Sequence, residues 1–149
     1  MREKLAEAMK AAMRAQDKTS LSTLRLINAA VHDRDIANRA TAKGAISDDE
    51  IVGVLGKMVK QREESARIYE EAGRIELADQ ERREIVVIKQ FLPKQLGEAD
   101  VKHACKQVID EVGAEGLRDM GKCMAALKER YAGQMDFSKA NGIVKGLLQ

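Results

Sequence analysis

The residues that could perform nucleophilic or acid–base chemistry are few, and their spacing does not bring them together. The chain has two histidines, His32 and His103, and two cysteines, Cys105 and Cys123. His103 and Cys105 are two residues apart, so on a helix their side chains point about 200° away from each other. Neither cysteine has a second cysteine or histidine at metal-site spacing. We therefore expect structural thiols and predict no catalytic residue, no metal and no cofactor.

The glycines do not form a phosphate-binding loop. Gly53 and Gly56 fall inside a helical pattern, and the chain contains no G-x-x-x-x-G-K-[ST] string. Gly142 and Gly146 repeat four residues apart, a spacing that allows close packing of helices or close approach of a ligand backbone. For this pair we predict packing against a neighbouring helix.

Positive charge concentrates near the C-terminal end. The 26 basic and 24 acidic residues give a net charge of only +2, so a nucleic-acid surface would have to be local. Residues 118–149 contain six basic against three acidic residues, and one of these, Asp136, has the position of a helix N-cap. Lysines at this end could bind phosphates without reading the base sequence. The alternative interpretation is that these cations only form an ordinary solvated surface. The candidate RNA-binding residues are Lys122, Lys128, Arg130, Lys139 and Lys145.

Composition favours a globular protein built from helices. Hydrophobic residues make up 44% of the chain, charged residues 34% and aromatic residues 3%, so Leu, Ile, Val, Met and Ala must form the core. No run of about 18 apolar residues occurs, and the first residues are charged. We expect a cytoplasmic protein with no membrane partner.

The first part of the chain predicts four helices. Apolar residues at helical spacing indicate one helix over 1–16 and a second from near Ser20, with Asp17 interrupting between them and a loop over 38–44 after them. Ser47 to Glu50 form a capping box for a third helix that stops at Gly73, and its alternating Arg and Glu residues are typical of intrahelical ion pairs. The fourth helix runs over 75–91, with inward residues Leu77, Ala78, Ile85, Ile88 and Leu92.

The remaining chain predicts a smaller unit of three helices. Pro93 is the only proline and marks a boundary, because it cannot continue a helix. A fifth helix follows from 97–100 to Gly113, and two shorter ones cover 119–131 and the chain after Asp136. Their inward residues include Cys105, Cys123, Leu127, Val144 and Leu147. The predicted fold is all-α, with an N-terminal bundle over 1–93 and a tail domain over 94–149.

Several strings resemble the GatB/YqeY family. In the tail these are Asp119 to Met124, Gly133 to Asp136 and Val144 to Leu147. The upstream strings are similar to the YqeY-type N-terminal region, so the resemblance covers most of the chain. They are Lys60 to Arg62, Ser65, Tyr69 to Arg74, Leu77 to Ala78, Glu81 and Phe91 to Leu96.

The resemblance implies a tail that engages tRNA, as it does in the B subunit of the glutamine-dependent tRNA amidotransferase, a carbon–nitrogen ligase. Asp119, Gly121, Gly133 and Asp136 would have architectural roles. The family's amidase and ATP-using centres lie in other domains, so we do not expect this chain to catalyse amidation alone.

Three hypotheses follow from these patterns. The leading one is a tRNA-binding accessory protein for a tRNA-dependent amidotransferase, with no DNA partner. The alternative is an adaptor that docks an aminoacyl-tRNA synthetase or an amidotransferase subunit through exposed apolar residues. The third is a chain that amidates tRNA unaided.

Overall fold

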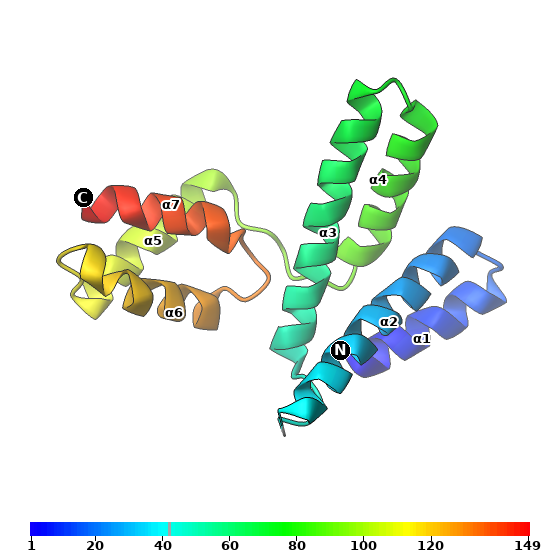
Figure 1. Cartoon of the computed structure of the whole chain (residues 1–149), viewed down its shortest axis with the longest axis horizontal. Coiled ribbons are helices and arrows are strands. Elements are labelled where there is room, and N and C mark those ends of the chain that lie inside the picture. The colour runs from blue at the N-terminus through cyan, green and yellow to red at the C-terminus, as the bar shows by residue number, and fades with distance from the viewer. Residues whose placement is uncertain (42) are drawn as a thin grey trace. The chain divides into compact units, whose positions relative to one another are not determined.

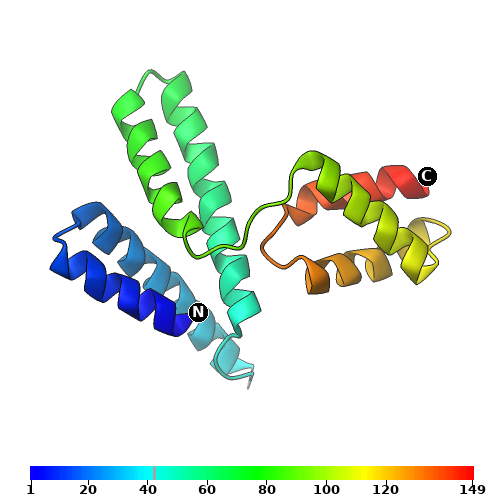
Figure 2. The same ribbon diagram turned by 180° about the vertical axis from the view of Figure 1, so that it is seen from behind.

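The computed structural model describes residues 1–41 and 43–149, and all its regular structure is helical. Figures 1 and 2 show α1 beside α2 and α3 beside α4, followed along the chain by the helices α5 to α7. No β-strand occurs in the described ranges, which confirms the predicted all-α class. The α-helices are α1 (Arg2–Arg14), α2 (Lys18–Ala40), α3 (Asp48–Glu71), α4 (Ile75–Lys89), α5 (Glu98–Val112), α6 (Met120–Arg130) and α7 (Phe137–Leu148), and a 3₁₀ helix, η1, covers Leu117–Asp119.

The turn between α1 and α2 is tighter than the sequence pattern predicts. Gln16 adopts a left-handed φ of 55°, and Asp17 N donates to Ala12 O at 3.0 Å, which closes the end of α1. Asp17 then caps α2, because its carboxylate accepts from Ser20 N at 3.1 Å. The second helix begins at Lys18, two residues before Ser20, and Asp17, which interrupts the apolar pattern, is its N-cap.

The connection from α2 to α3 ends at the predicted cap. α2 continues through Ala40, so the first part of the loop predicted over 38–44 is helical, and Ala42 lies outside the described residues. Glu50 N donates to Ser47 Oγ at 3.2 Å, and Ser47 N donates to Glu50 Oε1 at 3.4 Å. These reciprocal bonds confirm the capping box at the start of α3.

Asp35 fixes this connection to the start of the chain. The Asp35 carboxylate accepts hydrogen bonds from Arg2 Nη1 at 3.0 Å and Arg2 Nη2 at 2.9 Å. It also accepts from the backbone N–H of Ile46 at 2.9 Å. One side chain of α2 therefore holds both α1 and the segment before α3.

The α3–α4 pair confirms most of the predicted pattern and corrects one position. Gly73 has the expected left-handed φ of 75°, and Arg74 N donates to Tyr69 O at 2.8 Å across the turn. Leu77 was predicted to point inward, but it is 41% exposed, because it lies in the first turn of α4, where its neighbour Ala78 takes the buried position. Three residues of this helix that were predicted to lie in the core, Ala78, Ile85 and Ile88, are buried.

Charged side chains link the same two helices. Arg62 Nε donates to Glu84 Oε2 at 3.2 Å, and both side chains are largely shielded from solvent. The intrahelical pairs predicted for the third helix are also present, between Arg67 and both Glu64 and Glu71. Such exposed pairs contribute little individually, so the apolar residues between the helices dominate the packing.

The described residues divide into two compact units, Met1–Leu92 (unit 1) and Pro93–Gln149 (unit 2), each with its own core. No described helix is both long and apolar enough to cross a membrane. The buried core of unit 1 is formed by Leu5, Ala12, Leu24, Ile27, Val31, Ile46, Ile51, Leu55, Met58, Val59, Ile85, Val87 and Ile88. The buried core of unit 2 is formed by Val101, Ala104, Cys105, Val108, Cys123, Leu127, Met135, Ala140 and Val144.

Candidate nucleic-acid interface

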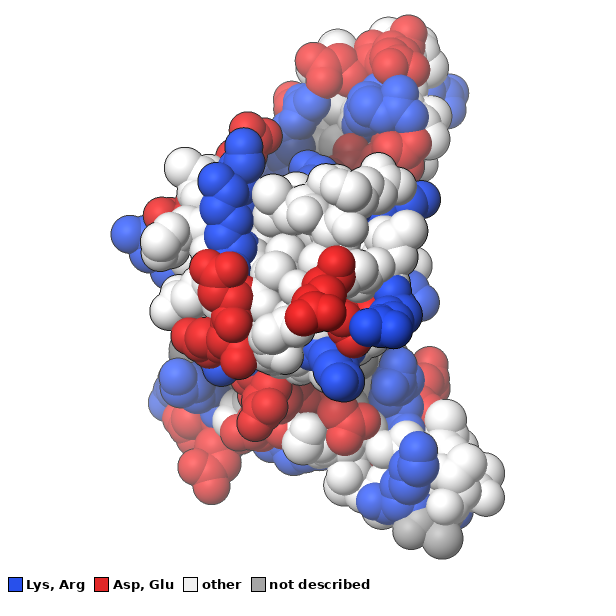
Figure 3. Space-filling view, turned by 90° about the vertical axis from the view of Figure 1, so that its left-hand side faces the viewer, with Lys and Arg blue, Asp and Glu red and all other residues white. Residues whose placement is uncertain are grey.

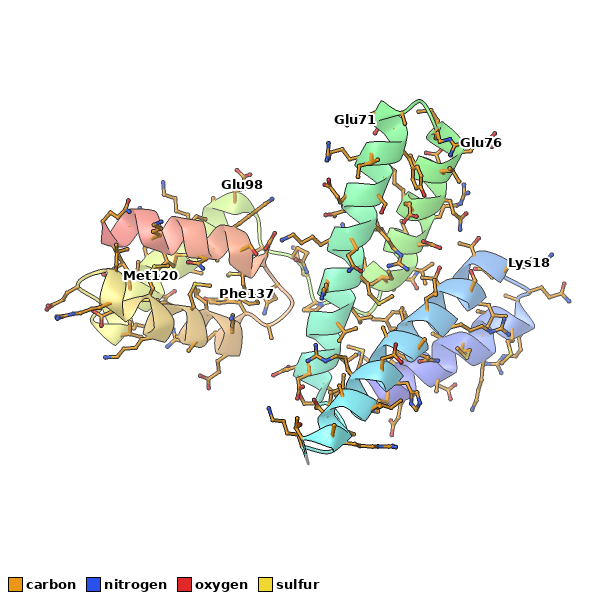
Figure 4. All side chains as sticks on the ribbon, viewed as in Figure 1. Lys18, Glu71, Glu76, Glu98, Met120 and Phe137 are labelled. Atoms are coloured by element: carbon orange, nitrogen blue, oxygen red, sulfur yellow. The ribbon has the colours of Figure 1, made fainter. Side chains whose placement is uncertain are left out.

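The helices of unit 2 bury one face each and turn the opposite face to solvent. Gly113, with a φ of 66°, ends α5 as predicted, and η1 leads into α6. Leu147 was expected in the core but is 38% exposed, since the adjacent position Leu148 packs against the core instead. Figure 4 labels Met120 and Phe137, the first residues of α6 and α7, and both pack against the core of unit 2.

The three candidate cations of α6 are exposed, and one of them is engaged in an ion pair. Lys122 and Lys128 are six residues apart, which separates them by about 9 Å along the helix axis and by roughly 120° around it. Arg130 forms a salt bridge with Glu111 of α5. No local pattern indicates this pairing, because Glu111 lies on a different helix, outside residues 118–149.

The two candidate lysines of α7 are exposed on a face that contains glycines. Lys139 and Lys145 lie on either side of Gly142, Gly146 follows Lys145, and both glycines are also exposed. A Cβ atom at either glycine would meet no other atom within 4 Å. The prediction that these glycines pack against a neighbouring helix is therefore wrong, because they face away from the core residues Ala140 and Val144.

The chain reversal between α6 and α7 arranges the candidate cations in two groups. The helices run in opposite directions side by side (Figures 1 and 2), so Lys128, Arg130 and Lys139 lie toward the turn, whereas Lys122 and Lys145 lie toward the other end. Figure 3 faces unit 2 and shows basic and acidic side chains interspersed around uncharged surface. This face therefore presents separate cations rather than one continuous basic patch.

Four further cations of unit 2, Lys94, Lys102, Lys106 and Arg118, were not among the predicted residues. Lys102 and Lys106 are exposed one turn apart on α5, and neither forms a salt bridge with any described residue. The helical pattern of α5 already places both opposite its buried residues. Both precede residues 118–149, where positive charge exceeds negative charge, so the sequence pattern did not single them out.

The residues expected to be architectural have different local roles. The carboxylate of Asp119 accepts from Glu115 N at 3.0 Å, and this hydrogen bond lowers the pKa of Asp119. Asp136 caps α7 by accepting from Ser138 N at 2.9 Å. Gly133 has a left-handed φ of 72° in the turn before it. Gly121 is exposed, and a Cβ there would meet nothing within 4 Å.

The turn containing Gly133 is joined to the segment just after Pro93. Leu96 N donates to Gln134 O at 2.8 Å, and the side-chain amide of Gln95 donates to Gly133 O. Two strings that are far apart in the sequence, Phe91 to Leu96 and Gly133 to Asp136, are therefore in direct contact.

The potentially nucleophilic groups of unit 2 are held in the core. Cys105 and Cys123 are fully buried free thiols, and burial raises the pKa of each, which favours the unreactive protonated form. His103 is exposed, so it does not share the environment of Cys105. In the described part of the chain, no group of three His, Cys, Asp or Glu residues could hold a metal ion.

Large exposed apolar side chains belong mostly to unit 1. Ile68, Ile75 and Leu77 are exposed on either side of the α3–α4 turn, where residues 73–77 line a shallow hollow. Ile75 and Leu77 are two residues apart on a helix and point in nearly opposite directions. These side chains therefore do not merge into one apolar surface.

The comparisons with known proteins point to one family. The chain is 31% identical over 108 residues to "Altered inheritance of mitochondria protein 41, mitochondrial" of Clavispora lusitaniae, covering 71% of this chain and 61% of that protein. The match thus spans about three fifths of that relative's length. A protein of the same name from Pyrenophora tritici-repentis is 27% identical over 82% of this chain and 68% of its own.

A third relative has a similar level of identity. It is an uncharacterized protein of Schizosaccharomyces pombe, 30% identical over 63% of this chain and 70% of its own length. The family profile described as "Yqey-like protein" matches residues 2–148 and so includes both units. The chain therefore belongs to the YqeY-like protein family.

Proposed function

We propose that this protein binds tRNA through unit 2 and has no catalytic centre of its own. The observation that carries the proposal is that the five predicted cations are all exposed on unit 2. Four of them form no salt bridge with a described residue, the exception being Arg130. The strings that resemble the tail domain of the amidotransferase B subunit support tRNA, rather than DNA, as the ligand.

Binding would rest on phosphate contacts. An exposed lysine has three hydrogen-bond donors and a point charge, which suit a phosphate oxygen. Contacts to phosphate do not distinguish one base from another. Pro93–Gln149 contains nine basic and eight acidic residues, so attraction must come from the local arrangement of charges rather than from net charge. The interaction should consequently be weak, blind to sequence and sensitive to salt.

A salt series of tRNA titrations tests this function. We expect binding at low ionic strength, with Lys128→Glu and Lys139→Glu each weakening it and reducing the slope of log affinity against log salt by about one. Lys57→Glu is the matched control, because Lys57 is exposed on α3 of unit 1. Absence of tRNA binding at the lowest salt concentration would contradict the proposal. An equal loss of tRNA affinity in the Lys57→Glu control would contradict it as well.

The proposed role is that of an accessory to a tRNA-dependent amidotransferase. In this role the carbon–nitrogen ligase chemistry, with glutamine as amide donor, belongs to the partner enzyme. Purified protein incubated with glutamine and misacylated tRNA should yield no amidated tRNA. Formation of that product by the chain alone would replace the accessory role with an enzymatic one.

A protein-interaction adaptor is the second candidate function. It rests on the exposed apolar residues of unit 1, such as Ile68, Ile75 and Val86, although these side chains are exposed singly and do not form the contiguous patch that is typical of a protein interface. The partner would be an aminoacyl-tRNA synthetase or an amidotransferase subunit. Binding of such a purified subunit that is lost in Ile68→Glu but kept in Lys128→Glu would favour the adaptor over RNA binding.

The compartment proposed for this activity is the cytoplasm. The buried free thiols Cys105 and Cys123 are compatible with a reducing environment. The names of two fungal relatives place those proteins in mitochondria. Cell fractionation that finds this protein in an organelle would contradict the proposal.

A further inference from the structure

The joint between the two units is short because both of its sides are anchored. Phe91 and Leu92 pack against the core of unit 1, and Leu96 packs against the core of unit 2. Only Pro93, Lys94 and Gln95 lie between these anchors. Four Cα–Cα steps join Leu92 to Leu96, which limits their separation to roughly 14 Å in any arrangement.

The side chain of Gln95 forms hydrogen bonds on both sides of this joint. Its amide nitrogen Nε2 donates to Pro93 O at 3.2 Å and also to Gly133 O. An amide NH₂ group has two hydrogens, so both bonds can exist together. One side chain thereby connects the start of the joint to the turn between α6 and α7.

We propose that Gln95 acts as a clamp that makes residues 93–96 move with unit 2. The pyrrolidine ring already fixes φ of Pro93 and restricts Leu92 before it, whereas the torsions of Lys94 have no such restriction. With the clamp closed, the pivot between the units is the junction of Leu92 and Pro93. Without it, the torsions around Lys94 become free and the joint lengthens.

The consequence is that residues 93–96 belong to unit 2, so any turning of one unit against the other must come from the torsions at Leu92 and Pro93. Because the clamp limits the torsion angles available at the joint, it determines how independently each unit can bind a ligand. This inference does not depend on what unit 2 binds, so it stands or falls separately from the proposed RNA-binding function.

Two substitutions at Gln95 separate the clamp from other effects. Gln95→Ala removes the amide, and Gln95→Glu keeps a similar shape but has no hydrogen to donate to a carbonyl when ionised. Gln107→Ala is the matched control, since Gln107 is exposed on α5 and has no side-chain bond to a described residue.

Trypsin reports on the joint directly, because the bond after Lys94 is a cleavage site inside it. Under native conditions we expect slow cleavage there in the natural protein and in the control, and severalfold faster cleavage in both Gln95 variants. Backbone ¹⁵N relaxation should show Lys94 and Gln95 becoming as mobile as a loop in the variants, with a larger difference in tumbling between the units.

Circular dichroism and hydrogen exchange at Val108 and Leu127 show whether a Gln95 variant has simply unfolded unit 2. These core amides should keep their protection in the Gln95 variants. If the variants show native protection together with unchanged cleavage at Lys94 and unchanged relaxation, the clamp is disproved. Loss of protection at Val108 and Leu127 would also overturn it, because Gln95 would then stabilise the whole unit.

Discussion

At the scale of single residues, Asp35 shows how distant parts of the chain determine a fold. It is the one charged residue that is buried among the described residues, with 8% of its surface exposed. The hydrogen bonds from Arg2 and from Ile46 N hold the pKa of Asp35 below its usual value, despite the opposing effect of burial. A buried charge of this kind is tolerated only because hydrogen bonds satisfy it.

We expect Asp35→Asn to lower stability at neutral pH. Folding lowers the pKa of Asp35, so the native state favours the ionised carboxylate and its contribution is complete above the unfolded pKa, about 3.9. This contribution disappears as the pH falls through the still lower folded-state value. Urea unfolding at several pH values should therefore show a difference between natural and variant proteins that narrows below pH about 4. A difference that is constant with pH would contradict the argument.

Asp35 also marks where sequence reasoning fails at this scale. Its partners lie 33 and 11 residues away, so no local pattern announces them. The Ser47 capping box was predictable because both partners lie within one helical turn. In the same way, the pairing of Arg130 with Glu111 depends on tertiary packing and was not foreseen.

At the scale of elements, α7 combines a well-packed inner face with an outer face that is poor for helix stability. Glycine inside a helix is less favourable than alanine because it loses more backbone entropy on folding. Gly142 and Gly146 are helical, exposed and free of neighbours that a Cβ would meet. Their structural role within unit 2 therefore does not require glycine.

Gly142→Ala and Gly146→Ala should each stabilise the protein by about 0.5–1 kcal/mol. Thermal and urea unfolding measure the change. Gly133→Ala is the control of opposite sign, because its φ of 72° is strained for alanine and should destabilise by roughly 1–2 kcal/mol. If the helical substitutions destabilise the protein, an unseen contact must cover this face of α7.

The positions of the helices were more predictable from the sequence than the burial of individual residues on them. The periodic apolar residues, the Ser47 cap and the glycines at 73 and 113 identified the helices and several of their ends. Leu77 and Leu147 were misassigned because, where two neighbouring positions are both apolar, periodicity does not decide which of them a tertiary contact buries: Ala78 is buried beside Leu77, and Leu148 packs against the core beside Leu147. That information resides in tertiary packing.

At the scale of the whole molecule, two separate cores explain why composition alone could not settle the organisation. The buried clusters of the two units share no residue. Their charge balance is similarly close to neutral, so net charge does not distinguish a nucleic-acid-binding unit from an ordinary one. A functional difference between them has to come from the arrangement of individual side chains.

Because unit 2 has a complete core, a fragment of residues 93–149 should fold on its own. Domains of this size bury only about 60% of the surface of the unfolded chain, so we expect modest stability, helical circular dichroism and cooperative urea unfolding. Its urea m-value should be smaller than that of the full chain, since less surface becomes exposed. A fragment that stays disordered until unit 1 is supplied would show that the core of Val101, Leu127 and Val144 is insufficient, and that the chain folds as one cooperative body.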